Sequence, residues 1–216
     1  MTVCKAEQVV HSDGRVRSVR LSNGESVSVH AAVIAAGPVE ACRMVEGSGH
    51  MSLGKWKKES VPLYGACLDL ALKRVPYPKR AFAIGIDEPA YFSNHSAVIP
   101  LSKNGETIIH VMKYNGSNPH SDARADERQL TRFLDLLQPG WEKEVVTARY
   151  LPNMLIASDS RSFRNHGTGV APGPAVKEIR GLYVAGDWVG SDGRLAETAM
   201  ASAKQAAVEA HRLLSE

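Results

Sequence analysis

The sequence has no long apolar run, few aromatic residues and only three cysteines. No stretch of its 216 residues approaches the roughly 20 apolar residues that cross a membrane. The start, MTVCKAEQ, has no apolar signal core. Cys4, Cys42 and Cys67 are widely spaced, which favours reduced thiols over a disulfide framework. We therefore expect a cytoplasmic protein with no transmembrane segment.

Signatures of nucleic-acid, metal and hydrolytic sites are also missing. The net charge is only +3 and the basic residues are dispersed, so no nucleic-acid partner is expected. No metal-ligand spacing is found among His95, His110, His120 and His166. His110 is interpreted as a partly buried structural residue. The sequence therefore predicts no metal site. It also has no GxSxG motif, no paired Cys–His signature and no Walker loop, so the catalytic residues stay unknown.

The most informative stretch is the C-terminal one, from Gly181 to Glu216. Leu182 to Ala185 is a short apolar run between two glycines, which is typical of a strand buried on both faces of a parallel sheet. A glycine-containing turn follows, in which Ser191 or Asp192 is expected to cap a helix. From Arg194 on, the spacing is helical, and one predicted face holds Leu195, Ala199, Ala203, Ala206, Ala210 and Leu213.

This arrangement places Gly186 and Asp187 where a buried strand ends. Ligands of open α/β sheets bind beyond the carboxyl ends of the strands. The Asp187 carboxylate can accept hydrogen bonds from sugar-like hydroxyls, and the free N–H groups near Arg194, Leu195 and Ala196 favour an anionic or carbonyl oxygen. Flavin adenine dinucleotide carries both kinds of group. The alternative is a strand-to-helix turn in which an aspartate merely caps the helix.

The segment Gly181–Ala207, GLYVAGDWVGSDGRLAETAMASAKQAA, resembles the C-terminal flavin-binding motif of FAD-dependent amine oxidases and phytoene- or squalene-type desaturases. In that family the acid after the glycine holds the flavin ribityl chain. The following helix N-terminus meets the pyrophosphate and the isoalloxazine carbonyl. The resemblance therefore implies cofactor contacts at Gly186, Asp187, and the backbone of Arg194, Leu195 and Ala196.

The N-terminal stretch fits the same family. A strand is expected over Val3 to Val10, a hairpin turn at Asn23-Gly24, and a buried strand over Ala31 to Ala36 that ends at Gly37. In the family, the first strand of such an excursion passes the adenine, which implies a contact near Ala6, and the glycine comes close to the dinucleotide. An ordinary β-meander is the alternative.

The middle of the chain changes character near Val61. Short alternating strands follow, and Ser121 to Leu137 predicts a capped amphipathic helix. An antiparallel sheet with one covering helix resembles the substrate domain of the family. The expected fold class is α/β mixed with α+β: residues 1–52 and 159–216 form part of a Rossmann-like FAD-binding domain, and residues 53–158 form the inserted substrate lobe.

Two features depart from the family. The glycine-rich GxGxxG unit that opens such enzymes is missing, so we expect an N-terminal half or subunit as partner. Where amine oxidases often hold a lysine, the chain has Asp69, and Arg194 replaces an aromatic residue. Asp69 is expected to be a solvent-facing carboxylate, with an acid–base role as the alternative.

These observations predict the C-terminal portion of an FAD-dependent oxidoreductase that acts on a small apolar or amine substrate. The alternative is a truncated, non-catalytic paralogue that serves as an interaction module without flavin. Without the first βαβ unit, apolar sheet edge is expected to be uncovered. We therefore expect a homo-oligomer.

Overall fold

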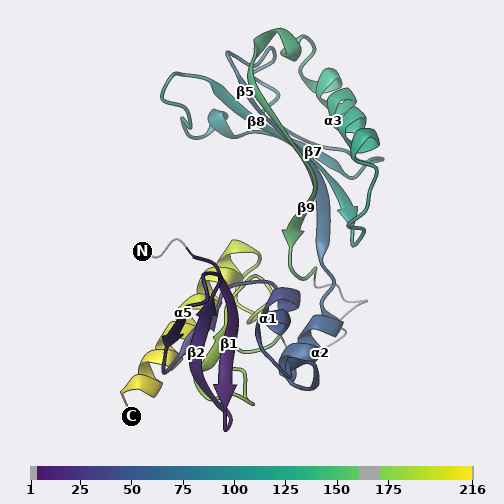
Figure 1. The fold of residues 1–216 in the computed structure, drawn as a ribbon. Coiled ribbons are helices and arrows are strands. Elements are labelled where there is room, and N and C mark those ends of the chain that lie inside the picture. Colours follow the sequence, from purple (N-terminus) through teal and green to yellow (C-terminus); the bar gives the residue numbers. More distant parts are fainter. Residues whose placement is uncertain (1–3, 161–170, 216) are drawn as a thin grey trace. The chain divides into compact units, whose positions relative to one another are not determined.

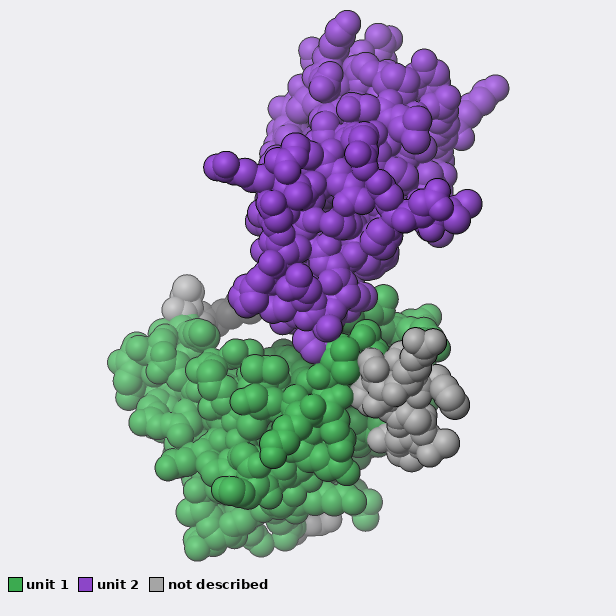
Figure 2. All heavy atoms as spheres, turned by 90° about the vertical axis from the view of Figure 1, so that its right-hand side faces the viewer, with its two compact units in different colours: residues 1–61, 157–216 green, residues 62–156 purple. Residues whose placement is uncertain are grey.

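The computed structural model describes residues 4–160 and 171–215, and it divides the chain into two compact units. Unit 1 contains residues 1–61 and 157–216, and unit 2 contains residues 62–156. Figure 2 distinguishes them by colour. Within the described residues, no helix is both long and apolar enough to span a membrane. Val3, where the first strand was predicted to begin, and His166, one of the four histidines considered as metal ligands, lie outside the described residues.

Unit 1 opens with a three-stranded antiparallel sheet (Figure 1). Its strands are β1 (Ala6–Ser12), β2 (Arg15–Leu21) and β3 (Ser26–Ser28). The Asn23-Gly24 turn joins β2 to β3, with Gly24 at φ +86°. The predicted hairpin is therefore confirmed, because glycine supplies the positive φ that this turn requires.

Strands β4 (Ala32–Ile34) and β10 (Leu182–Val184) form a separate two-stranded parallel sheet. The two apolar runs at opposite ends of the sequence thus pair, as expected for strands of one Rossmann-like sheet. On its far side, β10 is flanked by residues 174–176: the Val184 N–H donates to Pro174 O at 2.8 Å, and the Val176 N–H to Leu182 O at 3.0 Å. Ile34 of β4 and Leu182 and Val184 of β10 lie in the core of unit 1, together with Trp188.

The described residues of unit 1 form three α-helices: α1 (Pro38–Met44), α2 (Ser52–Glu59) and α5 (Ala196–Leu214). The predicted second lobe, residues 53–158, included all but the first residue of α2. In the structure, Leu53 of α2 is fully buried in the unit 1 core, and Trp56 contacts Trp188 with ring centroids 5.7 Å apart.

The predicted buried face of α5 is wrong in part. Ala206 is buried, but Leu195 and Ala203 are exposed. The buried stripe runs instead through Thr198, Ser202 and Ala206, which are four residues apart in sequence. Two polar side chains lie on this stripe because each is small enough for close approach, and Ser202 finds backbone partners there.

Unit 2 is a five-stranded antiparallel sheet with one covering helix (Figure 1). The strand order is β6-β7-β8-β5-β9. The bounds are β5 (Leu63–Leu72), β6 (Phe82–Ile84), β7 (Ala90–Asn94), β8 (Thr107–Gly116) and β9 (Val145–Ala157). Helix α3 (Ala123–Leu137) begins after Asp122, whose side chain accepts from the Arg124 and Ala125 amides. The predicted capped helix is confirmed.

Side-chain alternation gives this sheet two different faces. On β5, Leu68, Leu70 and Leu72 pack into one cluster with Leu130 and Leu134 of α3. The intervening residues of β5, including Cys67 and Asp69, therefore lie on the opposite face, which α3 does not cover. Short 3-10 helices, Ser48–His50 in unit 1, and His95–Ala97 and Trp141–Glu144 in unit 2, complete the fold.

Candidate functional site

The first candidate site lies in unit 1, where strands β4 and β10 end. The strands are parallel, so their carboxyl ends meet at one edge of the sheet. Gly37 follows β4 and Gly186 and Asp187 follow β10. The Ala185 N–H donates to Ile34 O at 3.1 Å and extends the pairing up to this edge. The predicted residues Gly37, Gly186 and Asp187 are therefore brought together by the sheet itself.

Ser158 also lies at this edge, although no sequence motif singles it out. Its backbone N–H donates to Asp187 Oδ2 at 2.7 Å. A Cβ added to Gly37 would lie 3.1 Å from Ser158 Oγ. Glycine at 37 thus leaves room for Ser158, and Ser158 orients the half-buried Asp187 carboxylate. Only the long-range folding of the chain places it here.

Gly186 is confined on two sides. An added Cβ would lie 2.8 Å from Trp188 Nε1, and the Trp188 indole donates to Ala36 O at 3.0 Å. The Gly186 N–H donates to Ser202 Oγ at 3.1 Å, and the Ser202 hydroxyl also lies 3.1 Å from Gly186 O. Helix α5 is thereby fixed directly against the strand end, which explains the requirement for small residues on both elements.

The turn into α5 is exposed at Arg194, Leu195 and Ala196. The helix begins at Ala196, and the residue before it, Leu195, has φ 51° and gives no side-chain cap. The interpretation of Ser191 or Asp192 as the cap is therefore wrong. Both residues lie too early in the turn. Among the described residues no side chain occupies the cap. The Glu197 N–H donates to Arg194 O at 3.1 Å, whereas the exposed Ala196 amide at the start of α5 keeps its capacity to bind a ligand oxygen.

A cavity of about 290 Å³ lies beside this turn, lined in part by Gly190, Asp192, Ser202 and Gln205. It belongs entirely to unit 1.

Ala6 does not take part in this arrangement. Ala6 begins β1 and pairs with Leu21, and no hydrogen bond between described residues joins it to Gly37, Gly186 or Asp187. The predicted adenine contact at Ala6 stays a prediction.

A second cluster lies on the face of the unit 2 sheet opposite α3. Cys67 Sγ lies 3.2 Å from Asp69 Oδ1 and 3.3 Å from each ring nitrogen of His110. His110 Nδ1 is also hydrogen-bonded to Asp69 Oδ1. Burial, followed by the bond to Asp69, raises the pKa of the Cys67 thiol. Asp69 is thus held by two partners, whereas the sequence predicted a simple solvent-facing carboxylate.

Two rings lie beside His110 in this cluster. The Tyr91 ring centroid lies 5.8 Å from that of His110, and the His95 ring is 5.5 Å from it. Burial, with a smaller contribution from Tyr114, raises the pKa of Tyr91 to about 12. The interpretation of His110 as a partly buried structural residue missed these contacts, because they depend on the register of β5 against β8.

Neither a protein-family model nor a curated protein matches the sequence. Solved structures do match. A putrescine oxidase variant redesigned in its cofactor binding has a TM-score of 0.69 and 10% identity, over 99% of this chain and 49% of that chain. Reduced UDP-galactopyranose mutase has a TM-score of 0.68 and 14% identity, over 98% and 46%. An oxidoreductase from Methanosarcina mazei has a TM-score of 0.63 and 13% identity, over 99% and 49%.

The chain therefore has the fold of one part of the FAD-dependent oxidoreductases that its sequence resembles, and the expected α/β class is confirmed. It spans about half the length of the structures it matches. At these identities the likeness establishes the fold alone.

Proposed function

We propose that the chain is the C-terminal portion of an FAD-dependent oxidoreductase that oxidises a C–H or C–N bond of a small apolar or amine molecule. The observation that carries this proposal is the meeting of Gly37, Gly186 and a positioned Asp187 carboxylate at the carboxyl edge of the β4–β10 sheet. Ligands of open α/β sheets bind at this edge.

The residues at the edge fit a flavin dinucleotide. The Asp187 carboxylate can accept hydroxyl donors, since a carboxylate has room for several hydrogen bonds besides the one from Ser158. The uncapped first turn of α5, from Ala196, favours an electron-rich oxygen. Gly37 and Gly186 allow Ser158 and Trp188 to pack closely against this edge. When bound, the flavin supplies the acceptor for the hydride, and this chain supplies its orientation.

The side of β4 that faces away from β10, here called its free side, supports the proposal that a second half of the protein is needed. The Ala32 N–H donates to Gly181 O, so this part of the backbone faces β10. On the other side of β4, no strand of the described chain is paired. Val33 is 45% exposed, although parallel strands are ordinarily buried on both faces. We propose that an N-terminal half or subunit with a GxGxxG unit contributes the next strand and most phosphate contacts.

The substrate lobe is assigned to unit 2. Asp69 stands where amine oxidases of the resembling family often hold a lysine, and it is bonded to Cys67 and His110. This difference supports a desaturase-like or other substrate rather than a conventional amine. The three free thiols of Cys4, Cys42 and Cys67 support a cytoplasmic location.

The experiment is to purify the chain with and without a co-expressed N-terminal half from a structural relative, and to record the flavin absorbance bands. We expect flavin only in the reconstituted pair. Asp187→Ala should weaken its binding by about 10- to 150-fold, because a hydrogen bond to a charged group contributes roughly 1.5–3 kcal/mol. Asp87→Ala is the matched control, since Asp87 is an exposed carboxylate in unit 2.

Stoichiometric flavin on the chain alone would overturn the need for a second half. Equal flavin content in the Asp187→Ala and Asp87→Ala pairs would remove Asp187 from its assigned role. A pair that assembles but never binds flavin would favour the alternative, a non-catalytic interaction module.

A further inference from the structure

The Cys67, Asp69 and His110 cluster is built by the sheet register rather than by a local motif. Residues two apart on a strand point to the same face, which places Cys67 and Asp69 side by side on β5. Asp69 pairs directly with His110 on β8. Directly opposed residues in antiparallel strands have Cβ atoms about 4.5–5.5 Å apart. Three different ligand types are therefore presented on one small area of the sheet.

The three side chains converge on one point. Their ligand atoms all lie within 4.8 Å of one another. Cys67 Sγ contacts the Asp69 carboxylate as well as the imidazole, and the Asp69 carboxylate contacts both Cys67 and His110. In a nucleophilic triad the imidazole lies between the thiol and the carboxylate, which do not touch. In the observed arrangement all three side chains contact one another, which differs from such a triad and suits the binding of one ion.

We propose that Cys67, Asp69 and His110 bind a divalent transition-metal ion of the Zn²⁺ type, with solvent or a substrate atom in the fourth position. Thiolate, imidazole and carboxylate are the ligands that Zn²⁺ takes in proteins. With three protein ligands, a tetrahedral ion keeps one position open. A tetrahedral Zn²⁺ with ordinary bond lengths holds a sulfur and a nitrogen ligand about 3.5 Å apart. The observed separations from the sulfur are 3.2 and 3.3 Å, so a small outward movement of the ligands admits the ion.

The surroundings suit a partly enclosed ion. Cys67 is fully buried and forms the floor of the site. The His110 and Asp69 side chains are 20% and 36% exposed, so an ion can enter from the open face of the sheet. The Tyr91 and His95 rings pack near His110 and restrict its orientation. When the sulfur–metal bond forms, the thiol proton leaves to solvent.

This proposal does not rest on the flavin. Every ligand lies in unit 2, and binding is measured without cofactor or activity. The probe is Co²⁺ added to the purified full chain after chelator treatment, followed by Zn²⁺ competition. We expect one equivalent of Co²⁺ to give a thiolate-to-cobalt charge-transfer band and the visible bands of tetrahedral cobalt. Zn²⁺ should remove both.

The variants distinguish this site from adventitious binding. Cys67→Ser should lose the charge-transfer band, and Asp69→Asn and His110→Gln should each weaken Zn²⁺ binding by at least about 10- to 100-fold, the loss seen even for outer-shell partners. Cys42→Ser and His120→Ala are the controls, because Cys42 is a buried thiol in unit 1 and His120 is an exposed histidine in unit 2.

Far-ultraviolet circular dichroism checks that each variant is folded. If Cys67→Ser fails to fold, Asp69→Asn provides the deciding test. The Asp69 side chain is partly exposed, and asparagine has the same shape as aspartate. A wild-type chain that shows no cobalt–thiolate band overturns the proposal. It is equally overturned if the band survives in Cys67→Ser, or if Asp69→Asn binds Zn²⁺ as tightly as the wild type.

Discussion

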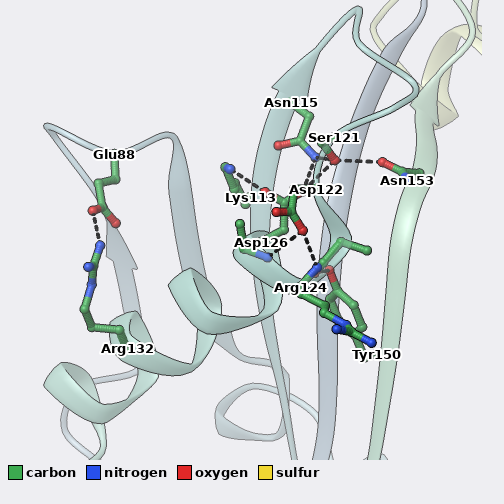
Figure 3. Close-up of polar contacts among 12 residues, drawn as sticks. Glu88, Lys113, Asn115, Ser121, Asp122, Arg124, Asp126, Arg132, Tyr150 and Asn153 are labelled. Carbon is green, nitrogen blue, oxygen red and sulfur yellow. Dashed lines mark hydrogen bonds and ion pairs between the residues drawn. The ribbon is translucent and has the colours of Figure 1, made fainter.

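Lys113 on strand β8 and Asp126 on helix α3 form an ion pair, with Lys113 Nζ 2.5 Å from Asp126 Oδ1 (Figure 3). The other carboxylate oxygen accepts from Ser121 Oγ at 2.6 Å and from Asn115 Nδ2 at 2.7 Å. Asp126 is only 2% exposed. The first turn of α3 is therefore attached to β8 by a carboxylate whose two oxygens are both bonded.

Replacing this carboxylate should destabilise the fold. Asp126→Asn leaves the Lys113 ammonium, which is 20% exposed, without its partner. We expect the free energy of unfolding to fall by an amount at the lower end of roughly 3–5 kcal/mol, because removal of one partner leaves a largely buried charge unpaired. Urea unfolding measures the change. Glu127→Gln, at the exposed neighbouring position, is the control and should change stability by less than about 0.5 kcal/mol.

The same carboxylate should make unit 2 sensitive to acid. Burial alone would raise the pKa of Asp126, but hydrogen bonds from Lys113, Ser121 and Asn115 outweigh it, and the pKa lies below its ordinary value of 3.8. A lowered folded-state pKa contributes stability above the unfolded-state pKa, and this contribution is lost as the pH falls through the folded-state value.

We therefore expect the stability difference between wild type and Asp126→Asn to be largest near neutral pH and to shrink as the pH falls below 3.8. Thermal unfolding of both proteins across this range measures it. A difference that stays constant down to the most acidic pH would show that the loss in Asp126→Asn has a cause other than the carboxylate charge.

Gly186 should not tolerate a methyl group. The added Cβ of Gly186→Ala would lie 2.8 Å from Nε1 of Trp188, a side chain buried in the unit 1 core. Trp188 must then move and weaken its bond to Ala36 O. We expect a loss of about 1–3 kcal/mol in the free energy of unfolding, as for other overpacked cores. Gly49→Ala is the control, because no atom lies within 4 Å of its added Cβ.

The parts of the fold that the sequence predicted are the local ones. The apolar runs at 31–36 and 182–185 each predict a buried strand without knowledge of its partner. The run at 182–185 is buried as predicted, but in the run at 31–36 only Ile34 is buried, and Val33 and Ala35 are exposed. The Asn23-Gly24 turn and the capped helix at 121–137 are also signalled by neighbouring residues. In each case the determining interactions lie within a few positions of the chain.

The contacts that the sequence did not predict are long-range. Cys67 and His110 are 43 positions apart, and only the pairing of β5 with β8 aligns them. Ser158 reaches Asp187 across a similar gap of 29 positions. On α5, the predicted face did not include Ser202, but its hydroxyl finds partners on Gly186 and is satisfied when buried.

The last prediction concerns association through the free side of β4. The backbone of Val33 lies on a strand whose only described strand partner is β10, and its side chain is 45% exposed. Unpaired strand edges with apolar side chains promote pairing with another chain, and a lysine on such an edge opposes it.

We expect the wild-type chain to form dimers or larger species at micromolar concentration, and Val33→Lys to shift the population towards monomer. Static light scattering measures both. Val208→Lys is the control, because Val208 is 60% exposed on helix α5, which has no strand edge. A wild-type chain that is already monomeric would contradict the prediction, as would an equal shift in the Val208→Lys control, which would show that added charge alone is responsible.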